Sequence, residues 1–230
     1  EVSDVGTRID AAGSAYDRDA AARSALYALL SRAFDNPDRE LHAAATSDDL
    51  TGEVDAYLER SSLSVERPDF ETGRDYEGLC GAYNRLFTLG HAEYPDRTDG
   101  SLDSEGPPVP LYESKYRDTD WNTINVDLAR AYEHYGLSVS GDERDHHDNL
   151  RLELEFGAYL ARREAAGEAD AARARRDFLD RHLVPFTTAL EQRLEDLEAG
   201  FYADLARLLD RIVTSDHRDL RERYGDCDYD

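Results

Sequence analysis

The 230-residue sequence predicts an all-α protein, folded as one helical bundle. In most segments apolar residues recur three and four positions apart, which is the spacing of one helix face, and strand-like alternation is nearly absent. Glycine and proline interrupt this pattern at intervals typical of helix ends. Because 40% of the residues are hydrophobic, enough to bury one continuous core, we expect a single domain over residues 17–220.

The N-terminal half is expected to contain four helices. Residues 1–16 are polar and lack a period, so they are expected to form a flexible terminus. An apolar stripe then predicts a first helix over about 18–34, which Asn36-Pro37 ends. The other helices predicted in this half are a short one after Asp38, one that carries Val54, Tyr57 and Leu58, and one that begins near Asp75.

Residues 91–120 form the longest stretch without a helical period. They contain Gly100, Gly106 and the prolines of segment 107–110, so we expect a long ordered loop before the central helices. Loops of this length are usually functional or disordered. Pro185 falls inside a helical pattern and is expected to kink it or to begin a new helix. The later helices are predicted at about 121–135, 148–165, 169–195 and 199–220, with breaks near Gly136, Gly167 and Gly200 and an acidic tail at 221–230.

The charge of the chain limits its partners. It has 27 basic and 51 acidic residues, a formal net charge of −24, and Lys115 is its only lysine. The acidic residues are spread over the whole chain, a pattern typical of proteins that stay soluble in a salt-rich cytoplasm. We therefore expect a halophilic source and a fold that needs salt to screen its self-repulsion. Nucleic acids and membrane surfaces are themselves anionic, which argues against both as partners.

Two further features predict a cytoplasmic protein. No segment approaches the roughly 18 uncharged apolar residues of a membrane span, and residues 1–19 lack the basic and apolar regions of a signal peptide. Cys80 and Cys227 lie far apart, with no histidine at ligand spacing beside either, so we expect reduced thiols.

The Asp-His-His-Asp segment at 145–148 allows an enzyme interpretation. His147 and Asp148 could hold a divalent metal, as in an all-helical HD-like phosphohydrolase, with His91 or His134 and a downstream carboxylate completing the site. The alternative is a charged helix start with Asp148 as the N-cap. Because a chain this rich in aspartate has many carboxylates at suitable positions, the motif favours the charged helix start over the metal site.

Other catalytic arrangements have weaker support. Glu153 and Glu155 are two residues apart, so they lie on different faces of a helix and cannot act as one acid and base pair. Ser114 and Cys80 are possible nucleophiles, but no strand-turn-helix setting surrounds either residue. No phosphate-binding glycine pattern is present.

The loop ends in a segment suited to binding a cationic peptide. The prolines of segment 107–110 favour an extended backbone, while Leu111, Tyr112 and Tyr116 offer large apolar surfaces. These residues could pack into the core or line a groove, and both uses can coexist. Glu113 supplies a carboxylate that a guanidinium could bind through two parallel hydrogen bonds.

Four short motifs, in this order, resemble the signature regions of the TorD/DmsD/NarJ-type chaperones of molybdenum-containing oxidoreductases. Their order and separation on an all-helical chain make the resemblance more specific than any one motif, and it extends over about residues 20–215. The motifs are 83–87 (Tyr-Asn-Arg-Leu-Phe), 110–114 (Pro-Leu-Tyr-Glu-Ser), 148–156 (Asp-Asn-Leu-Arg-Leu-Glu-Leu-Glu-Phe) and 178–186 (Phe-Leu-Asp-Arg-His-Leu-Val-Pro-Phe).

This resemblance implies a TorD-like helical bundle that is not an enzyme and needs no cofactor. It implies a cytoplasmic chaperone, monomeric or homodimeric, that binds the twin-arginine signal peptide of a DMSO, TMAO or nitrate reductase until the client's cofactor is inserted. The family commonly has Glu-x-Pro-Asp-His before the central helix, whereas here Asn149 follows Asp148 in place of the histidine. The positions carried over as peptide-binding candidates are Tyr83, Leu86, Phe87, Tyr112, Glu113, Asp148 and Asn149.

Overall fold

The computed structural model describes residues 17–70, 72–89, 94–95, 102–103, 106–139, 146–168 and 170–225. Within these residues the fold is helical, as the sequence predicts, apart from one antiparallel pair of two-residue strands. The flexible terminus predicted at 1–16 and the last five residues of the predicted acidic tail lie outside the described part of the chain. The helices are α1 (Arg18–Ala33), α2 (Arg39–Thr46), α3 (Asp49–Arg60), α4 (Tyr76–Tyr83), α5 (Trp121–His134), α6 (Leu150–Ala165), α7 (Ala171–Phe178), α8 (Val184–Asp196) and α9 (Phe201–Tyr224).

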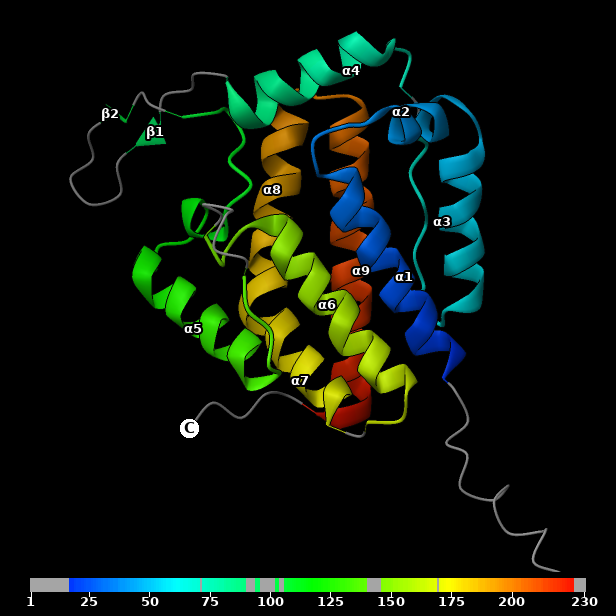
Figure 1. Ribbon diagram of the computed structural model, residues 1–230, viewed down its shortest axis with the longest axis vertical. Helices are drawn as coiled ribbons and strands as arrows, with labels where there is room; N and C mark the ends of the chain where they lie inside the picture. Colours follow the sequence, from blue (N-terminus) through cyan, green and yellow to red (C-terminus); the bar gives the residue numbers. More distant parts are fainter. Residues whose placement is uncertain are drawn as a thin grey trace, which may run out of the picture.

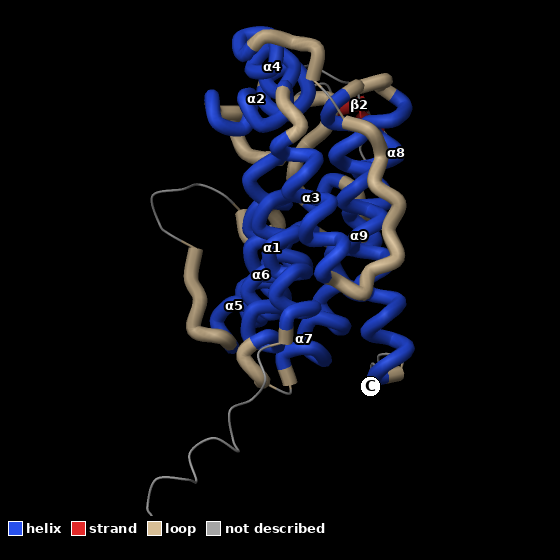
Figure 2. Tube along the Cα trace, turned by 90° about the vertical axis from the view of Figure 1, so that its right-hand side faces the viewer, coloured by secondary structure: helices blue, strands red, loops and turns tan. Residues whose placement is uncertain are grey.

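Four long helices form the centre of the bundle. Helix α1 packs along α6, and α8 packs along α9 behind them (Figure 1). Gly157 faces the Tyr27 ring of α1, and a Cβ atom there would lie 3.6 Å from that ring, at ordinary contact distance, so a side chain larger than a methyl group would push the two helices apart. Helix α4 crosses one end of the bundle, near α2, while α5 and α3 flank opposite sides (Figures 1 and 2). No helix among the described residues is long and apolar enough to cross a membrane.

Aspartate caps explain where several helices begin. The side chains of Asp17, Asp38, Asp75 and Asp120 each accept a hydrogen bond from a backbone N–H in the first turn of the helix that follows. These bonds satisfy donors that have no partner within the helix. The predicted breaks are also confirmed, since Gly136, Gly167 and Gly200 have positive φ angles of 71°, 89° and 59°. Helix α9 extends past the predicted end at residue 220 and through Tyr224.

Two π-helical turns interrupt the expected helices. The first, η1 (Asn84–Thr88), continues α4, and the second, η3 (Leu179–Leu183), joins α7 to α8 just before Pro185. Pro185 lies in the first turn of α8, so it begins a helix, as the sequence predicts, and the π turn joins that helix to α7. Since proline has no N–H, Pro185 cannot donate to the carbonyl of Arg181, four residues earlier.

The predicted loop is ordered where it approaches the bundle. It includes the strand pair β1 (Tyr94–Pro95) and β2 (Leu102–Asp103), and a 3₁₀ turn, η2 (Glu113–Lys115). Residues 106–116, here named the strap, are tied at one end by the bond from Val109 N–H to the Leu86 carbonyl, 2.9 Å. At the other end the Leu150 N–H donates to the Leu111 carbonyl, also at 2.9 Å. The strap thus connects η1 to the start of α6.

A buried charge network holds four helices in register. Both carboxylate oxygens of Asp216 are engaged, one by the Arg23 guanidinium at 2.7 Å and one by the Tyr27 hydroxyl at 2.8 Å. Arg175 lies 3.5 Å from the same carboxylate and 2.6 Å from Glu164. Arg23, Arg175 and Asp216 are fully buried. Removing one member would leave a fully buried charge with fewer partners, so the network favours this packing of α1, α6, α7 and α9 over alternatives.

Candidate functional site

The seven residues predicted to bind a peptide fall into two groups in the structure. Tyr83, Leu86 and Phe87 lie on α4 and η1, whereas the other four lie where the strap meets the start of α6. Val109, hydrogen-bonded to Leu86, and Glu113 are four residues apart on the strap, so the two groups are separated by no more than about 14 Å of extended backbone. The strap therefore links the two groups.

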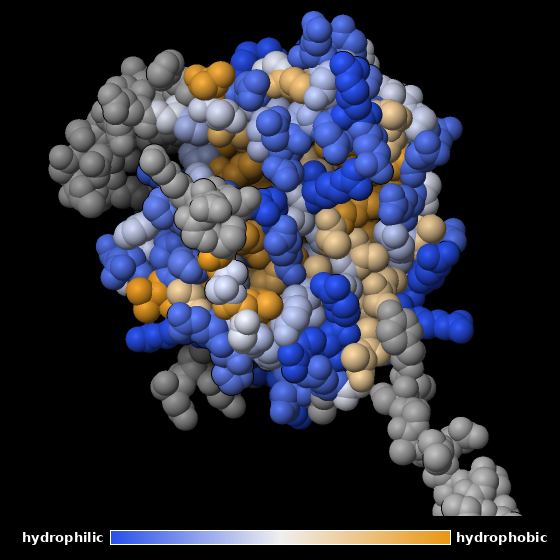
Figure 3. Space-filling view, in the orientation of Figure 1, coloured by the Kyte–Doolittle hydropathy of each residue, from blue (hydrophilic) through white to orange (hydrophobic). Residues whose placement is uncertain are grey.

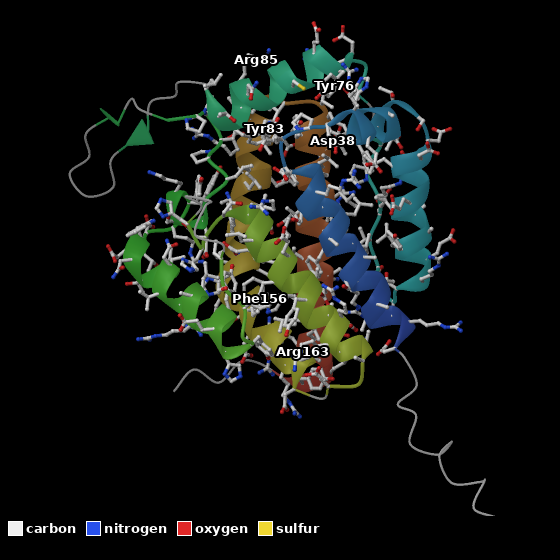
Figure 4. The ribbon with its side chains drawn as sticks, viewed as in Figure 1. Asp38, Tyr76, Tyr83, Arg85, Phe156 and Arg163 are labelled. Atoms are coloured by element: carbon white, nitrogen blue, oxygen red, sulfur yellow. The ribbon has the colours of Figure 1, made fainter. Side chains whose placement is uncertain are left out.

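Tyr83 and Phe87 belong to an aromatic cluster between α4 and α9. The Phe87 ring centroid lies 5.0 Å from that of Tyr83 and 5.1 Å from that of Tyr202, and 6.3 Å from that of Phe34. Phe87 is buried, while Tyr83 is half-buried and faces the bundle from α4 (Figure 4). The cluster therefore forms part of the core. Leu86 is half-buried and lines a cavity of about 270 Å³.

The other four residues anchor the strap. Tyr112 and Asn149 form an antiparallel bridge, and the Glu113 N–H donates to the Asp148 carbonyl at 2.9 Å. The Asp148 side chain, fully buried, accepts from the Ser114 N–H at 3.1 Å. The prediction that Asp148 caps α6 is wrong, since the Asn149 side chain accepts from the first turn and is the N-cap. Asp148 instead stabilises a contact with a segment more than thirty residues away.

Glu113 is already engaged within the protein. Its carboxylate is fully buried, and its two oxygens contact the Arg117 guanidinium and His182 Nδ1, the latter at 2.9 Å. Arg117 also donates to the Arg181 carbonyl at 2.9 Å, an acceptor to which Pro185 cannot donate. An incoming guanidinium would therefore have to replace Arg117 to reach Glu113.

Glu153 completes a trio of buried carboxyl groups with Glu113 and Asp148, named here the carboxyl trio. Glu153 is fully buried, and neither of its carboxyl oxygens has a hydrogen-bond partner within the described residues. Burial, and then the charges of Glu113 and Asp148, raise the pKa of Glu153 well above its usual 4.5. Glu155 is on the outside of the helix and pairs with Arg151 at 3.1 Å, which confirms that the two glutamates occupy different faces.

Beside the carboxyl trio lies a second cavity of about 520 Å³, between α5 and η3 and named the α5 cavity. His182 lies at its wall, where its Nε2 contacts Asp127 at 3.0 Å while Nδ1 contacts Glu113. Burial alone would lower the pKa of His182, but the hydrogen bonds that its ring donates to these two carboxylates outweigh burial and raise the pKa above 6.5. Asp127 also pairs with Arg181 at 2.6 Å. The cavity is therefore lined by acids and bases that largely neutralise one another.

Sequence reasoning missed the partners that surround Glu113. His182 was part of the motif at 178–186, but nothing local indicates that it meets a loop residue 69 positions away. Arg117 could have been found, because it stands four residues after Glu113, at a spacing that allows ion pairs.

The residues of the alternative hydrolase site have structural roles. The His147 carbonyl accepts from the Tyr132 hydroxyl at 2.9 Å, and Asp148 is directed to the strap. Over the part of the chain that the structure describes, no three histidine, cysteine or acidic side chains are arranged to hold a metal ion. Asp145, His91 and Cys227 lie outside that part, and Cys80 is half-buried with a free thiol.

Comparison with known proteins gives consistent matches. The family described as the nitrate reductase delta subunit matches residues 77–192. The selenate reductase assembly chaperone protein of Thauera selenatis is 33% identical over 161 residues, 63% of this chain and 82% of that protein. The chlorate reductase assembly chaperone protein of Ideonella dechloratans is 30% identical over 207 residues, 87% of this chain and 88% of that protein.

Two further matches are more distant. The perchlorate reductase assembly chaperone protein of Dechloromonas aromatica is 26% identical over 202 residues, with 84% of this chain and 87% of that protein covered. Among solved structures, a chain from Archaeoglobus fulgidus described as a redox enzyme maturation protein aligns with a TM-score of 0.46 and 21% identity, over 84% of this chain and 93% of that one.

Proposed function

This chain belongs to the nitrate reductase delta subunit family, whose curated relatives are assembly chaperones and not catalysts, and we propose that it receives the twin-arginine signal peptide of a molybdopterin oxidoreductase. The client would be met in the cytoplasm, before export, as an apo subunit with its signal peptide attached. The relatives that match are named for selenate, chlorate and perchlorate reductases, and the client proposed here is an oxidoreductase of that general kind.

The observation that carries the proposal is the pairing of Glu113 with an arginine of the chain itself. Arg117 shows that the site around Glu113 accepts a guanidinium, and the Arg117 side chain is only 26% exposed while bound there. A peptide arginine could replace it with little change in the number of charge-assisted hydrogen bonds. The exchange itself would therefore contribute little affinity, and other contacts must drive binding.

Apolar contacts are the natural source of that affinity. A twin-arginine signal peptide carries an apolar stretch after its arginine pair. Half-buried Tyr83 and Leu86 lie at the other end of the strap, and apolar surface is exposed in the hollow below α4 (Figure 3). An extended peptide of four or five residues spans the roughly 14 Å between the two ends of the strap. One signal peptide could thus place its arginine near Glu113 and its apolar stretch along α4.

In this proposal the seven residues have different tasks. Glu113 would receive a guanidinium, and Tyr83, Leu86 and Tyr112 would contact apolar side chains. Phe87, Asp148 and Asn149 would act indirectly, since Phe87 is in the aromatic cluster and the other two hold the strap.

The test is calorimetric titration of the protein with twin-arginine signal peptides and with twin-lysine versions of the same peptides. We would work in molar KCl, because a net charge of −24 repels itself strongly in dilute buffer. Arginine peptides are expected to bind at least about tenfold more tightly than lysine peptides, since lysine cannot form the two parallel bonds. Equal affinity for both peptides would refute a guanidinium-specific site.

Variants of the charge pair sharpen this test. Glu113→Gln should remove the arginine preference, whereas Arg117→Ala should strengthen arginine-peptide binding because it removes the internal competitor. Glu155→Gln, an exposed glutamate paired with Arg151, is the matched control and should bind like the wild type. The melting temperature of each variant shows whether the fold is kept. Weaker arginine-peptide binding by a folded Arg117→Ala protein would contradict the exchange.

A further inference from the structure

The cavity of about 270 Å³ that Leu86 lines carries a second inference. It lies between η1 and the start of α9 and is named the α9 cavity. At about 30 Å³ for each water, it has room for roughly nine waters, which suits a ligand of about ten non-hydrogen atoms.

Two arginines without partners line this cavity. Within the described residues neither Arg74 nor Arg85 makes a side-chain ion pair or hydrogen bond. Most arginines of known placement in this chain are paired, as Arg67 is with Asp55 at 2.6 Å. Glu198, whose side chain is exposed, is the one acidic residue in the lining. The lining of the α9 cavity therefore has a local excess of positive charge, although the whole chain has 51 acidic residues and a net negative charge.

The start of α9 adds hydrogen-bond donors. Its N-cap is Gly200, which has no side chain to accept from the first turn, and the helix is 24 residues long. The first-turn N–H groups and the helix dipole favour an anion at this end. Independently, Tyr202 lines the cavity with 1% of its surface exposed, and its hydroxyl has no hydrogen-bond partner among the described residues. Burial raises the pKa of Tyr202, so the hydroxyl keeps a proton to donate.

The remaining wall is apolar. Leu79, Ala82 and Leu86 contribute from α4 and η1, and Leu197, 45% exposed, lies at the rim. An inorganic anion would leave this surface in contact with water, whereas a ligand with a short hydrocarbon stem would cover it.

We propose that the α9 cavity binds a carboxylate on a short apolar stem, presented by a protein segment in which an acidic residue adjoins an apolar one. Arg74 and Arg85 would pair with the carboxylate, the Tyr202 hydroxyl and the first turn of α9 would donate to it, and the apolar wall would cover the stem. Apart from Leu86, these groups are not the ones proposed to hold the signal peptide, so the two sites can be tested separately.

The first experiment is ligand-observed NMR titration of the full chain with hexanoate, with hexanamide as the neutral equivalent, and with inorganic phosphate. Hexanoate should bind at least about tenfold more tightly than hexanamide, because bonds to a charged group are among the stronger hydrogen bonds. Equal binding of hexanoate and hexanamide would show that the cavity binds only the hydrocarbon chain, and would refute the proposed carboxylate site. Phosphate binding as tight as that of hexanoate would refute the claim that the ligand needs an apolar stem.

Variants assign the contacts. Arg74→Gln and Arg85→Gln should each weaken hexanoate binding about tenfold. Arg130→Gln is the matched control, since Arg130 is also exposed and without an ion pair among the described residues but lines the α5 cavity. Tyr202→Phe should weaken binding without lowering the melting temperature, because the hydroxyl has no partner to lose. Unchanged affinity in both arginine variants would refute the proposal.

A peptide titration then tests the source of the ligand. An acetylated Leu-Glu-Leu tripeptide amide should compete with hexanoate, and the Leu-Gln-Leu version should not. Competition that Arg85→Gln abolishes supports a protein segment as the partner. Failure of both peptides, with hexanoate still bound, would contradict that part of the proposal and leave a small-molecule site.

Discussion

Replacing Glu153 with glutamine tests whether the buried carboxyl trio contains a neutral acid. Glu153 is fully buried on α6, its two carboxyl oxygens are without hydrogen-bond partners in the described structure, and burial with the nearby charges of Glu113 and Asp148 raises its pKa well above 4.5. Arg117 opposes this shift without reversing it. Glutamine has nearly the same shape and no charge, so it resembles the protonated glutamic acid that the structure implies.

The effect on stability follows from proton linkage. Between pH 4.5 and the higher pKa of folded Glu153, the unfolded chain has released this proton while the folded chain keeps it. The contribution of Glu153 is fully present below pH 4.5 and is lost as the pH rises toward the folded pKa. The free energy of unfolding of the wild type should therefore fall by about 1.4 kcal/mol per pH unit relative to Glu153→Gln.

Urea unfolding at constant KCl concentration, from about pH 5 to pH 8, measures this slope. Glu153→Gln should lie close to the wild type near pH 5 and become progressively more stable than it above that pH. Glu155→Gln is the control, because Glu155 is 53% exposed and paired with Arg151 on the same helix. If the wild-type and Glu153→Gln curves stay parallel over this range, Glu153 titrates alike in both states and the assignment of a neutral acid fails.

Three further changes test the packing and charge assignments. Asp216→Asn should lower the free energy of unfolding by about 3 kcal/mol, measured in urea, because it removes the only fully buried carboxylate among the three that pair with Arg23 in the described residues. Gly157→Leu should cost about 1–3 kcal/mol in the same assay by pushing α6 from Tyr27, whereas Gly157→Ala, whose methyl would sit at ordinary contact distance, should be tolerated. His182→Gln should destabilise more at pH 6 than at pH 9, since a raised histidine pKa adds stability below pH 6.5 that is lost as the pH rises through the folded value.

The helices could be predicted because the interactions that begin and end them are local. Asp38 and Asp75 cap α2 and α4 through side-chain bonds to Leu41 and Gly78, each three residues ahead. The same reasoning assigned the cap of α6 to Asp148 and was wrong by one residue. The side chain of Asp148 is used by the strap, a contact across 34 residues that no local pattern reveals. Errors of this kind are expected wherever a capping residue type also has a distant partner.

The π turn before Pro185 also could not be predicted from the local sequence. The sequence indicates that a proline inside a helix needs a local adjustment, but a break, a kink and a π turn satisfy that need equally well. The structure has the π turn, and the carbonyl of Arg181, to which Pro185 cannot donate, accepts a hydrogen bond from Arg117. Since Arg117 directly follows the strap, the local geometry is linked to the position of a loop that lies 64 residues earlier.

The candidate site was predictable in its residue types but not in the state of its charges. In a chain with 51 acidic and 27 basic residues, a carboxylate beside an aromatic residue carries little information, because such neighbours occur by chance. Basic residues are scarcer than acidic ones, so a carboxylate that an arginine pairs with is more informative about binding than a carboxylate beside an aromatic residue. Arg117 holds Glu113, and Arg23 holds Asp216, which identifies both carboxylates as partners for a guanidinium. Of these two pairs, the one with Arg117 lies beside the α5 cavity, so an external arginine could exchange with it.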